Sequence, residues 1–184
     1  MKTDIVNTNH ENYPIKGDIE FRNVSYVYPN TGIKALDNLS FKIEAGKSLA
    51  IMGKTGSGKS TIALLLCRLI DPTEGEILID GKNLKEHNLV NYRKFIGYIP
   101  QESFLFSDTI ENNIGFSIDQ PSLKLVEEFA IKADVHKNIV EFKDQYKTMV
   151  GERGVMLSGG QKQRICIARA LIKEPKILIF DDSL

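Results

Sequence analysis

Residues 53–60, GKTGSGKS, have the types and spacing needed to hold a phosphate group, and they lie between a short apolar run and a helix-forming one. The glycines let the backbone bend so that several N–H groups approach one anion, and a helix start adds partial positive charge there. In this pattern Lys59 reaches the β- and γ-phosphates and the Ser60 hydroxyl is placed to bind Mg²⁺. A glycine-rich turn with an incidental lysine is the alternative. The residues predicted to line the site are Gly53, Lys54, Thr55, Gly56, Ser57, Gly58, Lys59, Ser60 and Thr61.

Two adjacent acids, Asp181 and Asp182, follow the apolar run Ile177–Phe180. A carboxylate at the tip of a buried strand lies at the edge of the sheet, and in phosphate-loop enzymes such an acid helps to hold Mg²⁺. We therefore predict that Asp181 is a metal ligand, the alternative being an acid that only caps a loop. The next position, Asp182, is where a general base would polarise the attacking water.

The motif LSGGQ, residues 157–161, predicts a second anion-binding helix start. Ser158 and Gln161 have the spacing of a capping box, and Gly159 and Gly160 leave bare amides at the first turn. One nucleotide needs only one phosphate loop. A second phosphate-binding helix start therefore indicates a dimer, in which this helix start faces the nucleotide of a partner. An ordinary capped helix after a glycine turn is the alternative.

The pattern of apolar and turn-forming residues predicts the elements that position these groups. A strand is expected at 48–52 and a helix at 59–70 on either side of the phosphate loop, and a helix at 158–173 precedes a strand at 176–180. Strands that alternate with helices indicate an α/β domain with a mainly parallel sheet. Other strands are expected at 18–28 with an irregularity at Asn23, at 35–43, within 75–84 and at 95–99, and helices within 121–147.

Composition limits the classes of function. Lys plus Arg and Asp plus Glu are 24 each, so bulk charge gives no reason to expect a nucleic-acid partner. Cys67 and Cys166 lie far apart in apolar surroundings and are expected to be reduced core thiols. Residues 1–17 are polar and irregular and are expected to be a tail or linker. The apolar runs are much shorter than the roughly 20 residues that span a bilayer.

With these motifs in this order, residues 18–184 resemble the nucleotide-binding domain of an ABC transporter: GKTGSGKS resembles the Walker A loop, LSGGQ the ABC signature and KILIFD the Walker B strand. The resemblance implies a P-loop NTPase core of RecA-like fold with a mainly parallel sheet, an antiparallel β subdomain and a helical subdomain. It also implies that Tyr28, in SYVYP, stacks on adenine, and that Gln101, in IGYIPQ, contacts Mg²⁺ and the attacking water. Without it, these two would be surface residues.

Two segments, FLFSDTIENNI at 104–114 and VGERG at 150–154, resemble those of multidrug and lipid exporters. In that subfamily Glu152 and the glutamine-loop region lie where cytosolic helices of the transmembrane domain dock. The resemblance implies ATP and Mg²⁺ as cofactors, and a second ABC ATP-binding domain and a transmembrane domain as partners. It places the chain at the cytoplasmic face of the cell membrane, attached through a transmembrane domain that is not in this sequence, where ATP-driven dimerisation would drive transport.

The chain departs from the family pattern at Asp182, where the usual residue is Glu. Asp is one methylene shorter, and a general base must lie about 2.6–3.2 Å from its water, so we expect weak hydrolysis at this site. Some exporters pair two different domains, one of which carries such a substitution, and we favour this heterodimer over a slow homodimer or an Asp base rescued by relaxation. The intact LSGGQ would then complete the partner's competent site.

The family pattern continues beyond Asp182 with a further apolar strand and a switch histidine that this sequence does not contain. His10, His87 and His136 all precede the acids and are expected to be solvated surface residues. We therefore expect residues 18–184 to be an incomplete ABC ATP-binding domain without its C-terminal strands, unstable alone.

Two other classes of function stay open. One is a soluble ABC ATPase not linked to transport, although the stretch between Lys59 and Leu157 is too short for the coiled coils of repair proteins and VGERG favours transport. The other is a domain that only binds ATP, with turnover left to the partner, which Asp182 keeps plausible.

Overall fold

A computed structural model describes residues 5–151 and 154–181 of the chain. These residues belong to two compact units, Met1–Ile96 and Gly97–Leu184. Two residues with predicted roles, Glu152 and Asp182, lie outside the described residues.

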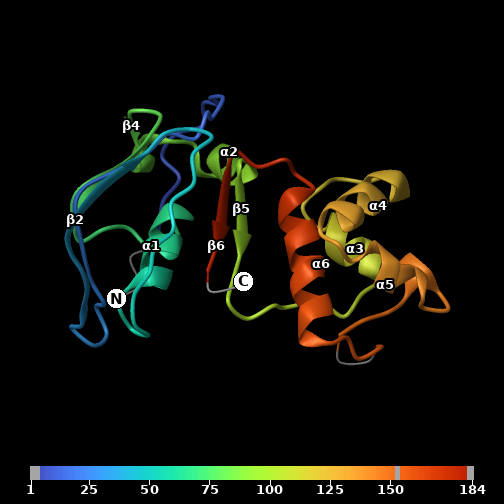
Figure 1. The fold of residues 1–184 in the computed structure, drawn as a ribbon. Helices are drawn as coiled ribbons and strands as arrows, with labels where there is room; N and C mark the ends of the chain where they lie inside the picture. The colour runs from blue at the N-terminus through green and yellow to red at the C-terminus, as the bar shows by residue number, and fades with distance from the viewer. Residues whose placement is uncertain (1–4, 152–153, 182–184) are drawn as a thin grey trace. The chain divides into compact units, whose positions relative to one another are not determined.

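The first unit is built on an antiparallel sheet with the strand order β2-β1-β3-β4 (Figure 1). The irregularity expected at Asn23 is confirmed, because Asn23 has a φ of 48° and β1 shifts its register between Phe21 and Val24. Phe21 and Val24 point into the core and are 1% and 0% exposed. The strands are β1 (Ile19–Val27), β2 (Lys34–Ile43), β3 (Glu74–Ile79) and β4 (Lys82–Asn83).

The helix that follows the phosphate loop is α1 (Lys59–Leu66), which is shorter than expected. The chain leaves the helix at Arg68, whose φ is 47°. A second helix that the sequence reading missed, α2 (Leu89–Lys94), begins at an Asn88 cap and lies after the 3₁₀ turn η1 (Leu84–Glu86).

Side chains of α2 hold the far end of α1. The Tyr92 hydroxyl donates to the carbonyl oxygen of Leu66 at 2.8 Å, and Arg93 donates from Nε to the carbonyl of Cys67 at 3.2 Å. These carbonyls lie in the last turn of a helix, where they have no partner within the helix. The contacts therefore fix α1 at the end opposite to the phosphate loop.

The strand expected at 48–52 is not formed, which corrects the prediction for this segment. Its apolar side chains Leu49, Ile51 and Met52 are 49%, 43% and 92% exposed. A strand exists only where its backbone pairs with a neighbour, and none of the described residues forms a ladder with this segment. The apolar pattern indicated a buried strand but carried no information about its pairing partner.

The polar segment before β1 is packed on the first unit, although it contains no helix or strand between residues 5 and 18. The Asn7 side chain accepts from the backbone N–H of Leu89 at 2.8 Å, and the Asp80 carboxylate accepts from the backbone N–H groups of residues 16–18 at 2.7–3.0 Å. Ile15 is 4% exposed. The role of residues 1–17 as a tail or linker stays a prediction.

The second unit combines a two-stranded sheet with a group of helices. Strands β5 (Ile96–Ile99) and β6 (Ile177–Phe180) are neighbours and run in the same direction (Figure 1). The helical elements of this unit are α3 (Ile110–Gly115), α4 (Leu123–Lys132), α5 (His136–Val140), the 3₁₀ turn η2 (Gln145–Lys147) and α6 (Gly159–Leu171). The helices expected within 121–147 and at 158–173 are confirmed, whereas the sequence did not predict α3.

One buried amide and one arginine fasten the segment 104–109 to the helices. Asn113, fully buried in α3, accepts from the backbone N–H of Phe106 at 2.9 Å and donates to the carbonyl of the same residue at 3.0 Å. Arg169 of α6 donates to the Asn113 side chain at 2.7 Å and to the carbonyl of Phe104 at 2.9 Å. Burial lowers the pKa of Arg169, and its guanidinium lies 5.2 Å from the centre of the Phe106 ring.

The replacement Asn113→Ala is expected to loosen this segment. It leaves the backbone N–H and carbonyl of Phe106 and one guanidinium N–H of Arg169 without this partner. These groups are partly buried, so the cost for each lies toward the lower end of about 1–3 kcal/mol. Amide hydrogen exchange of a peptide covering 104–115, measured in the intact protein, should therefore be about 10- to 100-fold faster. The control is Asn112→Ala, an exposed neighbour on the same helix whose side chain donates only to the solvent-accessible Asp108 carboxylate, at 2.8 Å. Water can replace this contact, so the variant should change exchange little. Equal exchange in the two variants would contradict the role given to Asn113.

The expectation of solvated histidines is wrong for His87, which is 4% exposed with Nε2 3.2 Å from the carbonyl oxygen of Ile79. Burial lowers the pKa of His87 below 6.5. Because the unfolded chain then binds more protons, this contribution to stability is complete above about pH 6.5 and decreases as the pH falls below it.

We therefore expect the melting temperature of the intact protein to fall between about pH 7.5 and pH 5.5, and to fall less in the variant His87→Gln. The control is His10→Gln, because His10 is exposed and its loss should leave the pH dependence as in the wild type. A His87→Gln variant with the full wild-type pH dependence would count against the assignment.

Candidate functional site

The phosphate loop in the first unit has the backbone geometry that the sequence predicted. Gly56 and Gly58 have φ values of 80° and 90°, in the left-handed region that favours glycine. A side chain at Gly58 would also meet the backbone, because an added Cβ would lie 2.5 Å from the carbonyl oxygen of Ala35. Gly58 is the N-cap of α1 and supplies no side-chain acceptor. The N-cap residue of α1 therefore leaves the capping of this helix start to other groups, and the binding of a phosphate there stays a prediction.

The predicted phosphate-binding lysine is held at this loop. Lys59 Nζ donates to the carbonyl oxygens of Gly53 at 2.9 Å and Lys54 at 3.2 Å. The backbone N–H of Ser57 closes a turn onto the carbonyl of Lys54 at 3.1 Å. These contacts place one positive charge beside the loop amides, which is the arrangement that a polyphosphate requires.

Tyr28, expected to stack on adenine, is brought to the same helix. Its hydroxyl lies 3.0 Å from the hydroxyl of Thr61, which is buried in the first turn of α1. Its ring packs edge-on against Tyr26, with centroids 5.0 Å apart. The structure thus joins Tyr28 to the phosphate-loop helix, while stacking on adenine stays a prediction.

In the second unit, the ends of β5 and β6 bring Asp181 and the start of the glutamine loop to one sheet edge. The backbone N–H of Asp181 donates to the carbonyl of Ile99 at 3.0 Å, and Gln101 follows Ile99 by two residues. Asp181 is 7% exposed, and the hydroxyl of Tyr98 donates to its Oδ2 at 3.2 Å. Sequence reasoning missed Tyr98, although a tyrosine in the apolar strand IGYI was a visible signal.

The helix start at LSGGQ has the predicted capping box. The Ser158 hydroxyl accepts from the backbone N–H of Gln161 at 3.2 Å, and the Gln161 side chain accepts from the backbone N–H of Ser158 at 3.0 Å. Gly159 and Gly160 are exposed, and a Cβ at either position would meet nothing within 4 Å. The first turn of α6 is therefore preformed and open, and its binding of a partner's nucleotide stays a prediction.

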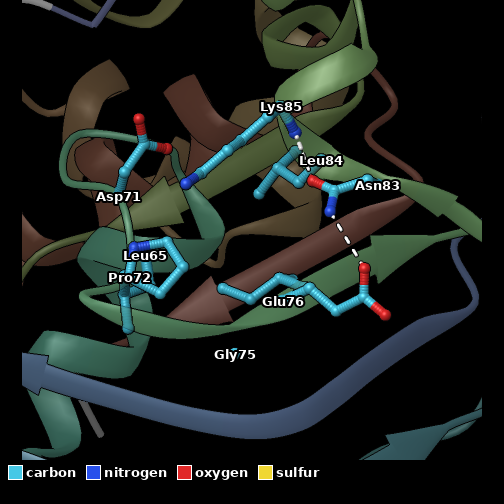
Figure 2. Close-up of a pocket in the computed structure, with 9 residues that line it drawn as sticks. Leu65, Asp71, Pro72, Gly75, Glu76, Asn83, Leu84 and Lys85 are labelled. Carbon is cyan, nitrogen blue, oxygen red and sulfur yellow. Dashed lines mark hydrogen bonds between the residues drawn. The ribbon is translucent and has the colours of Figure 1, made fainter.

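A cavity of about 30 Å³ lies elsewhere in the first unit, between α1, β3 and η1 (Figure 2). At its rim the Asn83 side chain donates to Glu76 at 3.1 Å and accepts from the backbone N–H of Lys85 at 3.0 Å. A cavity needs about 10–15 Å³ to hold one water molecule, so this one has room for water but not for a nucleotide. Its lining is Leu65, Asp71, Pro72, Gly75, Glu76, Ile77, Asn83, Leu84 and Lys85.

Within residues 5–151 and 154–181, no helix has the length and apolar character needed to cross a bilayer. The same part of the chain contains no group of three or more His, Cys, Asp or Glu side chains that could hold a metal ion. The predicted Mg²⁺ ligands are of a different kind, a hydroxyl from Ser60, an amide from Gln101 and one carboxylate from Asp181. Oxygen donors of these types suit Mg²⁺, which keeps several waters or substrate phosphates as its other ligands.

Known proteins similar to this chain are named as ABC-type transporters or as an ATP-dependent flippase. The chain is 46% identical over 183 residues to ABC transporter B family member 6 of Dictyostelium discoideum, covering 96% of this chain and 27% of the relative. It is 46% identical over 168 residues to the ATP-dependent lipid A-core flippase of Escherichia coli K12, covering 91% and 29%. Human ATP-binding cassette sub-family B member 5 is 45% identical over 170 residues, covering 92% and 14%. The chain thus spans less than a third of the length of these relatives.

A solved structure of a bacterial Atm1-family ABC exporter with ATP bound matches with a TM-score of 0.89 and 42% identity, covering 96% of this chain and 31% of that one. This match confirms the expected P-loop NTPase fold. The family model described as ABC transporter matches residues 36–184, which include the phosphate loop, the LSGGQ helix and Asp181. The chain therefore contains an ATP-binding domain and belongs to the ABC transporter family.

Proposed function

We propose that this chain is the ATP-binding and ATP-hydrolysing domain of an exporter-type ABC transporter. The phosphate loop is the observation on which the proposal rests. Its positive-φ glycines and the Lys59 ammonium group, which donates to two loop carbonyls, lie together at the start of α1, where a triphosphate would bind. Relatives named as a flippase and as B-family transporters support an export function. The protein would work at the cytoplasmic face of a membrane, attached through a transmembrane domain.

In the proposed site the loop amides and Lys59 bind the phosphates, and the Tyr28 ring covers the adenine face. Ser60, Gln101 and Asp181 would hold Mg²⁺, which neutralises the charge that develops on the phosphates. Gln101 would also orient the attacking water, whose proton the Asp182 carboxylate accepts. Gly159 and Gly160, between Ser158 and Gln161, would place their open amides on the nucleotide of a second ABC ATP-binding domain.

The dimer partner is proposed to be a different ABC domain. The carboxylate of Asp182 is one methylene shorter than the usual glutamate, and a misplacement of about 1 Å costs on the order of 100-fold in rate. The capping box at Ser158 is intact, so the chain keeps the part that would complete the partner's site. Binding of ATP without turnover at this chain's own site is the second candidate, and the same aspartate favours it.

The variant Lys59→Ala is expected to weaken ATP binding. Loss of a charge-assisted contact worth about 1.5–3 kcal/mol should raise the Kd by about 10- to 100-fold. The measurement is a titration of the intact protein with a fluorescent ATP analogue in the presence of Mg²⁺. Lys47→Ala removes an exposed lysine before the loop and should leave the Kd unchanged. An undiminished affinity in Lys59→Ala would refute the proposed site.

The variant Asp182→Glu is expected to raise ATP turnover about 10- to 100-fold, since the longer side chain restores the reach of a general base. The KM for ATP should change little, because the phosphate loop is untouched. Turnover is measured in the intact protein, alone and with its partner domain. Asp181→Glu is the matched control, because the same extension at the proposed metal ligand should lower turnover. A turnover that Asp182→Glu does not raise would remove the support for a weakened site.

A further inference from the structure

Asp181 is fixed by its backbone at the end of the β5–β6 pair. Its N–H donates to the carbonyl of Ile99 at 3.0 Å, so the two strand ends are joined immediately before the glutamine loop begins. This bond sets the position of the Cα atom. The carboxylate itself can still rotate about two side-chain bonds, and a metal ligand needs that rotation to be restricted.

The pleat of the two strands places one tyrosine on the same face as this carboxylate. Side chains of a strand alternate between faces, and a Cβ at Gly97 would meet Leu178 at 2.7 Å. Gly97 and Leu178 therefore share one face, and Tyr98 and Asp181 lie on the other. The hydrogen bond of 3.2 Å from the Tyr98 hydroxyl to Asp181 Oδ2 agrees with this arrangement.

The burial of Asp181 makes this contact important. With 7% of the residue exposed, water has limited access to replace a lost donor, and a hydrogen bond to a charged acceptor is stronger than one between neutral groups. The phenol donates to one identified oxygen, Oδ2, and so favours one rotation of the carboxylate. Hydrogen-bond partners of metal ligands act in this way, and their loss typically lowers metal affinity about 10- to 100-fold.

We propose that Tyr98 is a positioning residue for magnesium: its hydroxyl orients the Asp181 carboxylate toward the cation that accompanies ATP. The proposal rests on the proposed function, in which Asp181 is a ligand of that cation. In this role Tyr98 acts on the cation through its hydrogen bond to Asp181 and is a positioning residue, not a ligand.

The test is the variant Tyr98→Phe in the intact protein, which removes the hydroxyl and keeps the ring. The Kd of a fluorescent ATP analogue is measured with Mg²⁺ and again with EDTA, and the gain in affinity that Mg²⁺ provides is compared. Since the phosphates of ATP also hold the cation, we expect this gain to decrease about 3- to 10-fold. The Kd in EDTA should stay as in the wild type.

Two controls separate positioning from a general loss of structure. Tyr146→Phe also removes a buried hydroxyl of the second unit, one that lies 2.8 Å from His136 Nδ1, and should not change the gain from Mg²⁺. In an Asp181→Asn background, Tyr98→Phe should have no further effect, because the group through which it acts is already changed.

Equal gains from Mg²⁺ in the wild type and in Tyr98→Phe would overturn the proposal, as would an additive effect in the Asp181→Asn background. Failure of the proposed function gives a different result, since the wild type would then bind no ATP analogue with or without Mg²⁺.

Discussion

The first turn of a helix carries N–H groups that have no partner within the helix, and the chain meets this constraint differently at the two helices proposed to bind phosphate. At α1 the cap is Gly58, which has no side-chain acceptor, and in the proposed function a phosphate of ATP supplies an acceptor there. At α6 the Ser158 capping box already satisfies part of the turn. The α6 start is therefore ordered without a ligand, as the proposed binding of a nucleotide from a second ABC domain requires.

Each of these helices is also fixed toward its other end, by side chains distant in sequence. Tyr92 donates to the carbonyl of Leu66 at the end of α1, and Arg169 in the last turns of α6 binds Asn113 and the segment after the glutamine loop. An anion site made of backbone amides has no flexible side chain with which to adjust. Its accuracy depends on where the whole helix lies, so in the proposed function these distant contacts contribute to binding by fixing the two helices.

The parts of the site that depend on local sequence were predictable, and those that depend on a distant partner were not. The positive-φ glycines and the capping box follow from residues next to one another. The strand expected at 48–52 failed because pairing needs a neighbour that the pattern does not identify. The contact of Tyr98 with Asp181 joins residues 83 positions apart, and only the adjacency of β5 and β6 reveals it.

In the proposed function the two adjacent acids have separate tasks, Asp181 in binding the cation and Asp182 in turnover. The proposed metal ligand Asp181 is held by the backbone of β5 and by Tyr98, so its reach to the cation is set by the sheet. A base at position 182 depends instead on the length of its own side chain. If Asp182 is that base, its loss of one methylene leaves the amides, Lys59 and Asp181 unchanged, and would weaken hydrolysis without weakening the binding of ATP. A domain altered in this way would keep its nucleotide for longer, which suits a subunit that stabilises a dimer while its partner turns over.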